Sequence, residues 1–129
     1  MRVLIVEDSN SIRLFLRHLV QELGHEVVGE APNGREGIEQ FRKLRPDFTL
    51  MDINMPVMDG VAALKKIKEI APEARVVMLT STNSATTVLE CVREGLLNYI
   101  LKDLPRAELL AELRASFERV SEPSPEPAP

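Results

Sequence analysis

A fivefold alternation of short apolar runs with segments of helical periodicity dominates the chain. The runs are rich in Val, Ile and Leu and are continuous, as strands buried on both faces require. They cover residues 3–6, 25–29, 48–51, 75–79 and 99–101. Strict alternation of strands and helices predicts a parallel sheet with right-handed crossovers and helices on both faces. The expected fold class is therefore α/β, a doubly wound sheet of (βα)5 type.

Capping and helix-breaking residues mark where the intervening helices begin and end. Residues 9–11 offer N-caps for the first helix, and Gly24 follows its end as a C-cap glycine would. Asn33 opens the second helix, which stops before Pro46, and Pro105 is a suitable first residue for the last helix. The apolar face expected for the first helix contains Ile12, Phe15, Leu16, Leu19, Val20 and Leu23. The fourth helix is expected to pass through Val88, Leu89 and Val92.

The composition predicts one globular domain followed by a short tail. The chain has 129 residues, 44% of them apolar, which is enough to bury one core. We assign residues 1–120 to this domain. Residues 121–129 carry a proline at alternate positions and no large apolar side chain, so they are predicted to form a Pro-rich disordered tail.

Charge and cysteine content argue against several classes of partner. The net charge is −4 and no basic run stands out, which argues against binding to nucleic acid or to an anionic membrane. No apolar run approaches the length of a membrane span, and no apolar leader is expected before the first strand. The single cysteine, Cys91, cannot form an internal disulfide, which favours a cytoplasmic location.

Polar residues suited to chemistry stand at the carboxyl ends of the predicted strands. Glu7 and Asp8 end the first strand, and Asp52 ends the third. Thr80 follows the fourth strand and Lys102 the fifth. In open parallel sheets these strand ends share one edge, and ligands bind beyond it. The side chains are therefore expected to lie close together.

Three carboxylates at one site repel one another, and a divalent cation removes that conflict. Magnesium is predicted, because it prefers oxygen ligands and keeps several waters. Asp52 is assigned as the nucleophile that accepts a phosphoryl group, while Glu7 and Asp8 would hold the metal, one of them through water. Lys102 would pair with the phosphoryl oxygens, and Thr80 would donate a hydrogen bond to one of them.

Other polar residues are interpreted as structural. Asp59 and Gly60 are expected to form a turn and a helix start. Arg13 and Arg17 are interpreted as part of a solvated helix face. Tyr99 is expected to be a half-buried packing residue, which is compatible with a functional role.

The ordered set of motifs resembles the receiver domain of two-component response regulators, over about residues 2–119. The residues that carry the resemblance are Glu7, Asp8, Asp52 in the segment Asp-x-Asn-Met-Pro-x-Met-Asp-Gly, Thr80, Tyr99 and Lys102. Residues 26–31 and 58–64 are similar to chemotaxis-type single-domain regulators. The resemblance implies a flavodoxin-like sheet of five parallel strands in the order 2-1-3-4-5.

The resemblance also implies a mechanism. A sensor histidine kinase would phosphorylate Asp52, with Mg2+ bound by Asp8, Asp52 and the backbone carbonyl of Asn54. Thr80 and Tyr99 would act as switch residues that alter the face formed by the fourth helix, fifth strand and fifth helix. The implied partners are the kinase and a downstream target protein or a phosphotransfer protein. The chain would be a signalling switch rather than an enzyme, catalysing only its own phosphoryl transfer and dephosphorylation.

The residue after Lys102 departs from the family pattern. Asp103 directly follows Lys102, where the family usually has a proline, often in a cis peptide. A cis bond to a residue other than proline costs about 3 kcal/mol, so the Lys102–Asp103 peptide is predicted to be trans.

Alternatives to a chemotaxis-type regulator stay open at this point. A phosphorelay shuttle would pass the phosphoryl group from Asp52 to another histidine. A phosphatase with an aspartyl-phosphate intermediate would need a second acid two residues after the nucleophile, where this chain has Asn54. A degenerate receiver that serves as a constitutive interaction module is disfavoured by the intact acid pair, Thr80 and Lys102.

Overall fold

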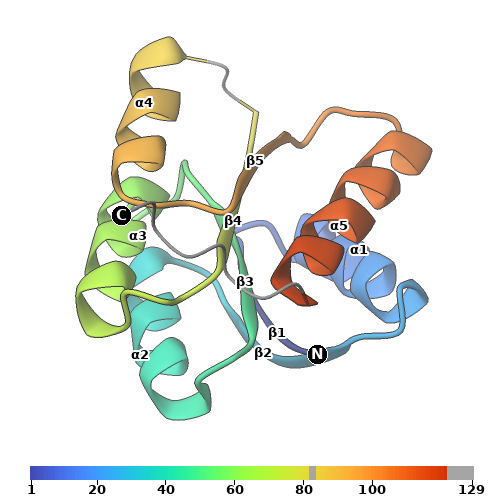
Figure 1. Cartoon of the computed structure of the whole chain (residues 1–129), viewed down its shortest axis with the longest axis horizontal. Helices are drawn as coiled ribbons and strands as arrows, with labels where there is room; N and C mark the ends of the chain where they lie inside the picture. The colour runs from blue at the N-terminus through green and yellow to red at the C-terminus, as the bar shows by residue number, and fades with distance from the viewer. Residues whose placement is uncertain (82–83, 122–129) are drawn as a thin grey trace, which may run out of the picture.

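The computed structural model describes residues 1–81 and 84–121. It is an α/β fold in which a parallel sheet has helices on both faces (Figure 1). Over the described residues the sheet contains five strands in the order β2-β1-β3-β4-β5, which confirms the predicted flavodoxin-like topology. The strands are β1 (Arg2–Val6), β2 (Glu26–Ala31), β3 (Phe48–Asp52), β4 (Val76–Thr80) and β5 (Asn98–Leu101). The helices are α1 (Asn10–Glu22), α2 (Gly34–Leu44), α3 (Gly60–Ile70), α4 (Ala85–Arg93) and α5 (Arg106–Ser121).

The helices form two layers, one on each side of the sheet. α1 and α5 cover one face, while α2, α3 and α4 cover the other (Figure 1). Successive side chains of a strand point to opposite faces. In β1, Val3 and Ile5 therefore pack on the α1 and α5 side, and Leu4 and Val6 pack on the other side. The sheet is buried on both faces, as its continuous apolar runs predicted.

The predicted caps define where the helices begin and end. Ser9, Asn33 and Asp59 are the N-caps of α1, α2 and α3, and each side chain accepts a hydrogen bond from a backbone N–H of the first turn. Gly24 follows α1 with a φ of 86°, a left-handed conformation that glycine adopts without strain. The loops after β1 and β3, which carry Glu7, Asp8 and Asp52, therefore each lead into a helix with an N-cap side chain.

Some element boundaries differ from those predicted. β2 extends to Ala31 rather than to residue 29, because its last residues continue the parallel pairing with β1. α5 begins at Arg106, directly after Pro105, and continues through Ser121. Residues 122–129 of the predicted tail lie outside the described part of the chain, so the boundary between domain and tail stays a prediction.

Two helices expose apolar residues that their periodicity had placed on an apolar face. Phe15 is 37% exposed, because α1 buries Leu16, Leu19 and Val20 instead. Leu89 and Val92 on α4 are also exposed, whereas Cys91 of the same helix is fully buried. Among the helices of the described ranges, none combines the length and apolar character that a membrane span demands.

Candidate functional site

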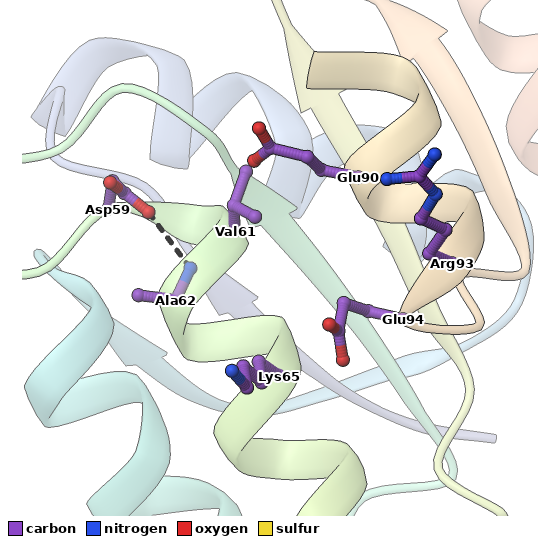
Figure 2. Close-up of a pocket in the computed structure, with 7 residues that line it drawn as sticks. All are labelled: Asp59, Val61, Ala62, Lys65, Glu90, Arg93 and Glu94. Atoms are coloured by element: carbon purple, nitrogen blue, oxygen red, sulfur yellow. Dashed lines mark hydrogen bonds between the residues drawn. The ribbon is translucent and has the colours of Figure 1, made fainter. Parts of the chain in front are cut away.

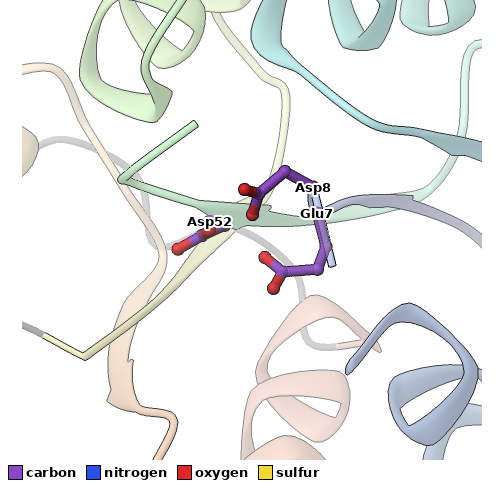
Figure 3. Close-up of side chains that lie close together, drawn as sticks. All are labelled: Glu7, Asp8 and Asp52. Atoms are coloured by element: carbon purple, nitrogen blue, oxygen red, sulfur yellow. The ribbon is translucent and has the colours of Figure 1, made fainter. Parts of the chain in front are cut away.

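The acids predicted to act together meet at one edge of the sheet. Glu7 and Asp8 directly follow β1, and Asp52 ends β3. Each offers a carboxylate oxygen, and these oxygens lie within 4.8 Å of one another (Figure 3). Glu7 and Asp52 are only 1% and 4% exposed, whereas Asp8 is exposed. The cluster therefore has two acids in the protein interior and one at the surface.

Lys102, directly after β5, neutralises part of this charge. Its Nζ donates to Oε1 and Oε2 of Glu7 at 2.8 and 2.9 Å, and it lies 3.0 Å from Oδ1 of Asp52. Its backbone N–H donates to the carbonyl of Thr80 at 2.8 Å, which ties it to the end of β4. The peptide bond between Lys102 and Asp103 is trans, as predicted. With Asp103 in this position, the ammonium group contacts both buried acids.

Glu7 has a much higher proton affinity than an exposed glutamate. Burial raises the pKa of Glu7 from 4.5 to about 7, the neighbouring Asp52 adds to the rise, and Lys102 opposes it. Burial lowers the pKa of Lys102, but its hydrogen bonds to Glu7 and Asp52 outweigh burial and raise that pKa overall. The single ammonium group of Lys102 therefore does not fully neutralise the negative charge of the carboxylates. A further cation or a bound proton neutralises the rest.

The donor set fits magnesium. The three acids supply oxygen ligands, and the exposed position of Asp8 leaves room for the waters that Mg2+ retains. Both oxygens of Glu7 already accept hydrogen bonds from Lys102, so Asp8 and Asp52 are better placed to bind directly. Glu7 would then act through water, as predicted for one member of the acid pair. Asn54 follows β3 at the same edge, and the role of its carbonyl stays a prediction.

The loop between β3 and α3 packs tightly against the end of β3. The N–H of Gly60 donates to the carbonyl of Ile53 at 2.7 Å. A Cβ atom on Gly60 would lie 2.0 Å from the carbonyl oxygen of Asp52, so only glycine fits there. Within the loop, Val57 has a φ of 70°, which strains a β-branched residue and which no sequence pattern indicated. The main chain around Asp52 is thus fixed from the α3 side.

Thr80 and Tyr99 lie on the paired strands β4 and β5. Thr80 is fully buried at the end of β4, and Tyr99 is half-buried in β5. Burial raises the pKa of the Tyr99 hydroxyl, and a side-chain hydrogen bond with Thr80 opposes that rise. The two residues predicted to act as a switch are therefore in contact.

The prediction that Arg13 belongs to a solvated helix face is wrong. Its side chain is only 18% exposed, and Nη1 donates to the backbone carbonyl of Glu7 at 2.7 Å. Arg17, one turn later, is 43% exposed and fits that description better. A long side chain in the first turn of a helix points back toward the helix N-terminus, here toward the acid pair. The only sequence signal for this contact was the place of Arg13 in the first turn of the helix that follows the pair.

A cavity of about 400 Å³ lies apart from the acid cluster, between the first turns of α3 and the surface of α4 (Figure 2). Its lining residues are Asp59, Val61, Ala62, Lys65, Glu90, Arg93 and Glu94. Asp59 serves there as the cap of α3, since Oδ1 accepts a hydrogen bond from the N–H of Ala62 at 2.9 Å. The chemistry assigned to Asp52 does not involve this cavity.

The raised pKa of Glu7 predicts a pH-dependent stability. Native Glu7 keeps its proton up to a pKa of about 7, whereas the unfolded chain releases it near 4.5. The native state therefore binds more protons within that window, and Glu7 contributes less stability as the pH rises through it. Between about pH 5 and pH 7.5, the free energy of unfolding of the metal-free wild type should fall by on the order of 1 to 3 kcal/mol relative to that of Glu7→Gln. Urea unfolding with a chelator measures this difference, and a difference independent of pH would contradict the assignment.

The model of a known protein family matches most of the chain. The family described as "Response regulator receiver domain" matches residues 3–114. This range contains every residue of the acid cluster, together with Thr80, Tyr99 and Lys102.

Individual proteins of similar sequence and structure agree with that match. A chemotaxis protein CheY from Thermotoga maritima is 37% identical over 112 residues, which is 87% of this chain and 93% of the relative. The response regulator domain of Thermotoga maritima CheB has a TM-score of 0.87 at 32% identity, covering 97% of this chain and 98% of that one. The CheX-CheY-BeF3-Mg+2 complex from Borrelia burgdorferi has a TM-score of 0.85 at 30% identity, covering 91% and 89%.

Proposed function

Because the chain belongs to the response regulator receiver domain family, we propose that it is a chemotaxis-type regulator that accepts a phosphoryl group on Asp52 from a sensor histidine kinase. The observation that carries this proposal is the placement of Lys102. Its Nζ contacts both Glu7 and Asp52, and the carboxylate of Asp8 lies beside them. The packing of the apolar core does not require such a cluster of charged groups. A buried carboxylate with an ammonium group within 3.0 Å is poised to take up a negatively charged group.

The residues divide the work of phosphoryl transfer. A carboxylate oxygen of Asp52 attacks phosphorus while the P–N bond of the donor phosphohistidine breaks. The ammonium group of Lys102 forms an ion pair with the phosphoryl oxygens, and the Thr80 hydroxyl donates a hydrogen bond to one of them. Asp8 and Asp52, with Glu7 and the carbonyl of Asn54 in support, would hold Mg2+, which would neutralise negative charge on the transferred group.

The signal would leave the site through Thr80 and Tyr99. Phosphorylation draws Thr80 toward Asp52, which removes its hydrogen bond with the Tyr99 hydroxyl. Tyr99 then repacks, and the face of α4, β5 and α5 changes its affinity for a target protein. The phosphoryl group thus biases an equilibrium between two arrangements of that face.

This role is that of a signalling switch rather than of an enzyme with a freely exchanging substrate. The buried, unpaired thiol of Cys91 supports a cytoplasmic location, where a histidine kinase presents its phosphohistidine. The surface of α4 includes exposed Leu89 and Val92, which supports a protein partner for that face.

Beryllofluoride, a stable mimic of the phosphoryl group, tests the proposed switch. With Mg2+ present, it should shift the amide NMR signals of Asp52, Thr80 and Lys102, and also those of Tyr99 and the exposed surface of α4. The same titration of Asp52→Asn is the control and should leave these signals unchanged. Shifts confined to the acid cluster in the wild type would contradict the switch, and the absence of any shift would contradict the acceptor site.

A further inference from the structure

We infer that Arg13 is a positioning residue for the metal site, holding the main chain of the acid pair in place for Mg2+. The inference rests on the proposed function, because it assigns to Arg13 a role in the same site. Arg13 lies in the first turn of α1 and faces away from solvent.

The guanidinium group of Arg13 joins three parts of the structure. Nη1 donates to the carbonyl of Glu7 at 2.7 Å, and Nη2 donates to Oδ1 of Asn10 at 2.5 Å. Nε lies 3.3 Å from Oε1 of Glu30, at the end of β2. A planar guanidinium with a contact at each of its three nitrogens has little freedom to rotate. Arg13 is therefore a rigid link between α1, β2 and the residue that follows β1.

The contact with Glu7 fixes the peptide unit that leads to Asp8. On its other side, the N–H of Glu7 donates to the carbonyl of Ala31 at 2.9 Å. Both backbone polar groups of Glu7 are thus held, one by β2 and one by Arg13. The carbonyl of Glu7 belongs to the Glu7–Asp8 peptide plane, so its hydrogen bond sets the direction from which the Asp8 side chain leaves the main chain.

The orientation of Asp8 depends on this backbone hydrogen bond more than that of Glu7 or Asp52 does. Glu7 and Asp52 are buried and paired with Lys102. Asp8 is exposed, and no hydrogen bond or ion pair to its carboxylate occurs among residues 1–81 and 84–121. In the metal-free protein, the conformation of the main chain is therefore what orients the Asp8 carboxylate. Groups that orient metal ligands in this way commonly contribute 10-fold or more to metal affinity.

The effect is one of position rather than of charge. The raised pKa of Glu7 comes from burial and from Asp52, Lys102 opposes the rise, and Arg13 is not among its causes. Glu30, which pairs with Arg13, also pairs with Arg17. Arg17 thus shares the ion pair of Arg13 without touching the acid pair, which makes it a matched control.

Titration with Mg2+, followed by the amide NMR signals of Asp8 and Asp52, tests the inference on the full chain. Arg13→Gln should raise the Kd for Mg2+ about 10-fold, because Asp8 is no longer pre-positioned. Arg17→Gln should change the Kd by less than about twofold, because in the described part of the chain Arg17 pairs with Glu30 and makes no hydrogen bond with Glu7 or Asp8. Arg13→Lys keeps the charge but not the three-way contact, and its Kd should rise as in Arg13→Gln. Urea unfolding of each variant shows which of them are folded.

Several outcomes overturn the inference. Equal effects of Arg13→Gln and Arg17→Gln on Kd would show that the Glu30 ion pair, and not the contact with Glu7, matters. A wild-type Kd for Mg2+ in Arg13→Lys would show that the positive charge alone suffices. If Arg13→Gln does not fold, the comparison of Arg13→Lys with the wild type still tests the inference. Absence of Mg2+ binding by the wild type would instead reject the proposed function itself.

Discussion

Acetyl phosphate with Mg2+ is expected to add one phosphoryl group to the wild-type chain and none to Asp52→Asn, as measured by intact-mass spectrometry. The amide of asparagine is neutral and a poor nucleophile, so the attack on phosphorus is lost while the side chain keeps its shape. Asp52 is 4% exposed and close to Lys102, and asparagine can still accept a hydrogen bond there. The expected loss is therefore chemical rather than a consequence of unfolding.

Asp59→Asn is the matched control for that experiment. Asp59 is another acid of the loop after β3, but its carboxylate caps α3. Asparagine is an equally good N-cap, so this variant should remain folded and accept a phosphoryl group as the wild type does. A chelator should abolish phosphorylation of both the wild type and Asp59→Asn. Equal labelling of Asp52→Asn and the wild type would remove Asp52 as the acceptor.

Gly60→Ala is expected to cause a large loss of stability, about 3 kcal/mol or more. Its Cβ would lie 2.0 Å from the carbonyl oxygen of Asp52 and 2.8 Å from the Cα of Ile53, and neither is the movable end of a side chain. The end of β3 would have to shift, which also displaces the acceptor carboxylate. Urea unfolding should show a much lower midpoint, and any folded fraction should accept phosphoryl groups slowly.

Gly24→Ala separates this steric effect from the loss of a glycine as such. Gly24 has a φ of 86°, but a Cβ there would meet no atom within 4 Å. Only backbone strain opposes that substitution, at a cost of about 1 kcal/mol. If Gly60→Ala is no more destabilising than Gly24→Ala, the close approach of α3 to Asp52 does not constrain the site.

Local sequence signals predicted most of the fold because those signals are themselves the physical causes. Short continuous runs rich in β-branched residues favour strands buried on both faces, and Ser9, Asn33 and Asp59 satisfy helix-end N–H groups wherever a helix follows them. The acid cluster was predictable for a related reason. A parallel sheet brings Glu7 and Asp52 to one edge regardless of sequence details elsewhere.

Features that depend on long-range contacts were not predictable in the same way. The periodicity of α1 groups Phe15 with the core, yet only the packing of neighbouring helices decides which part of an apolar face stays exposed. Arg13 looks like any other helical arginine until Glu7 and Glu30 are placed beside it. The left-handed conformation of Val57 likewise follows from the closure of its loop, since nothing in a valine favours it.

Reduction of the phosphorylated wild-type chain with borohydride tests the central claim most directly. Borohydride converts an acyl phosphate to an alcohol, and tandem mass spectrometry of the digested protein then identifies the residue that carried it. The account predicts modification at Asp52 alone, and only when Mg2+ was present during phosphorylation. Modification of Glu7, Asp8 or Asp59 with Asp52 intact, or modification that persists in a chelator, would contradict it.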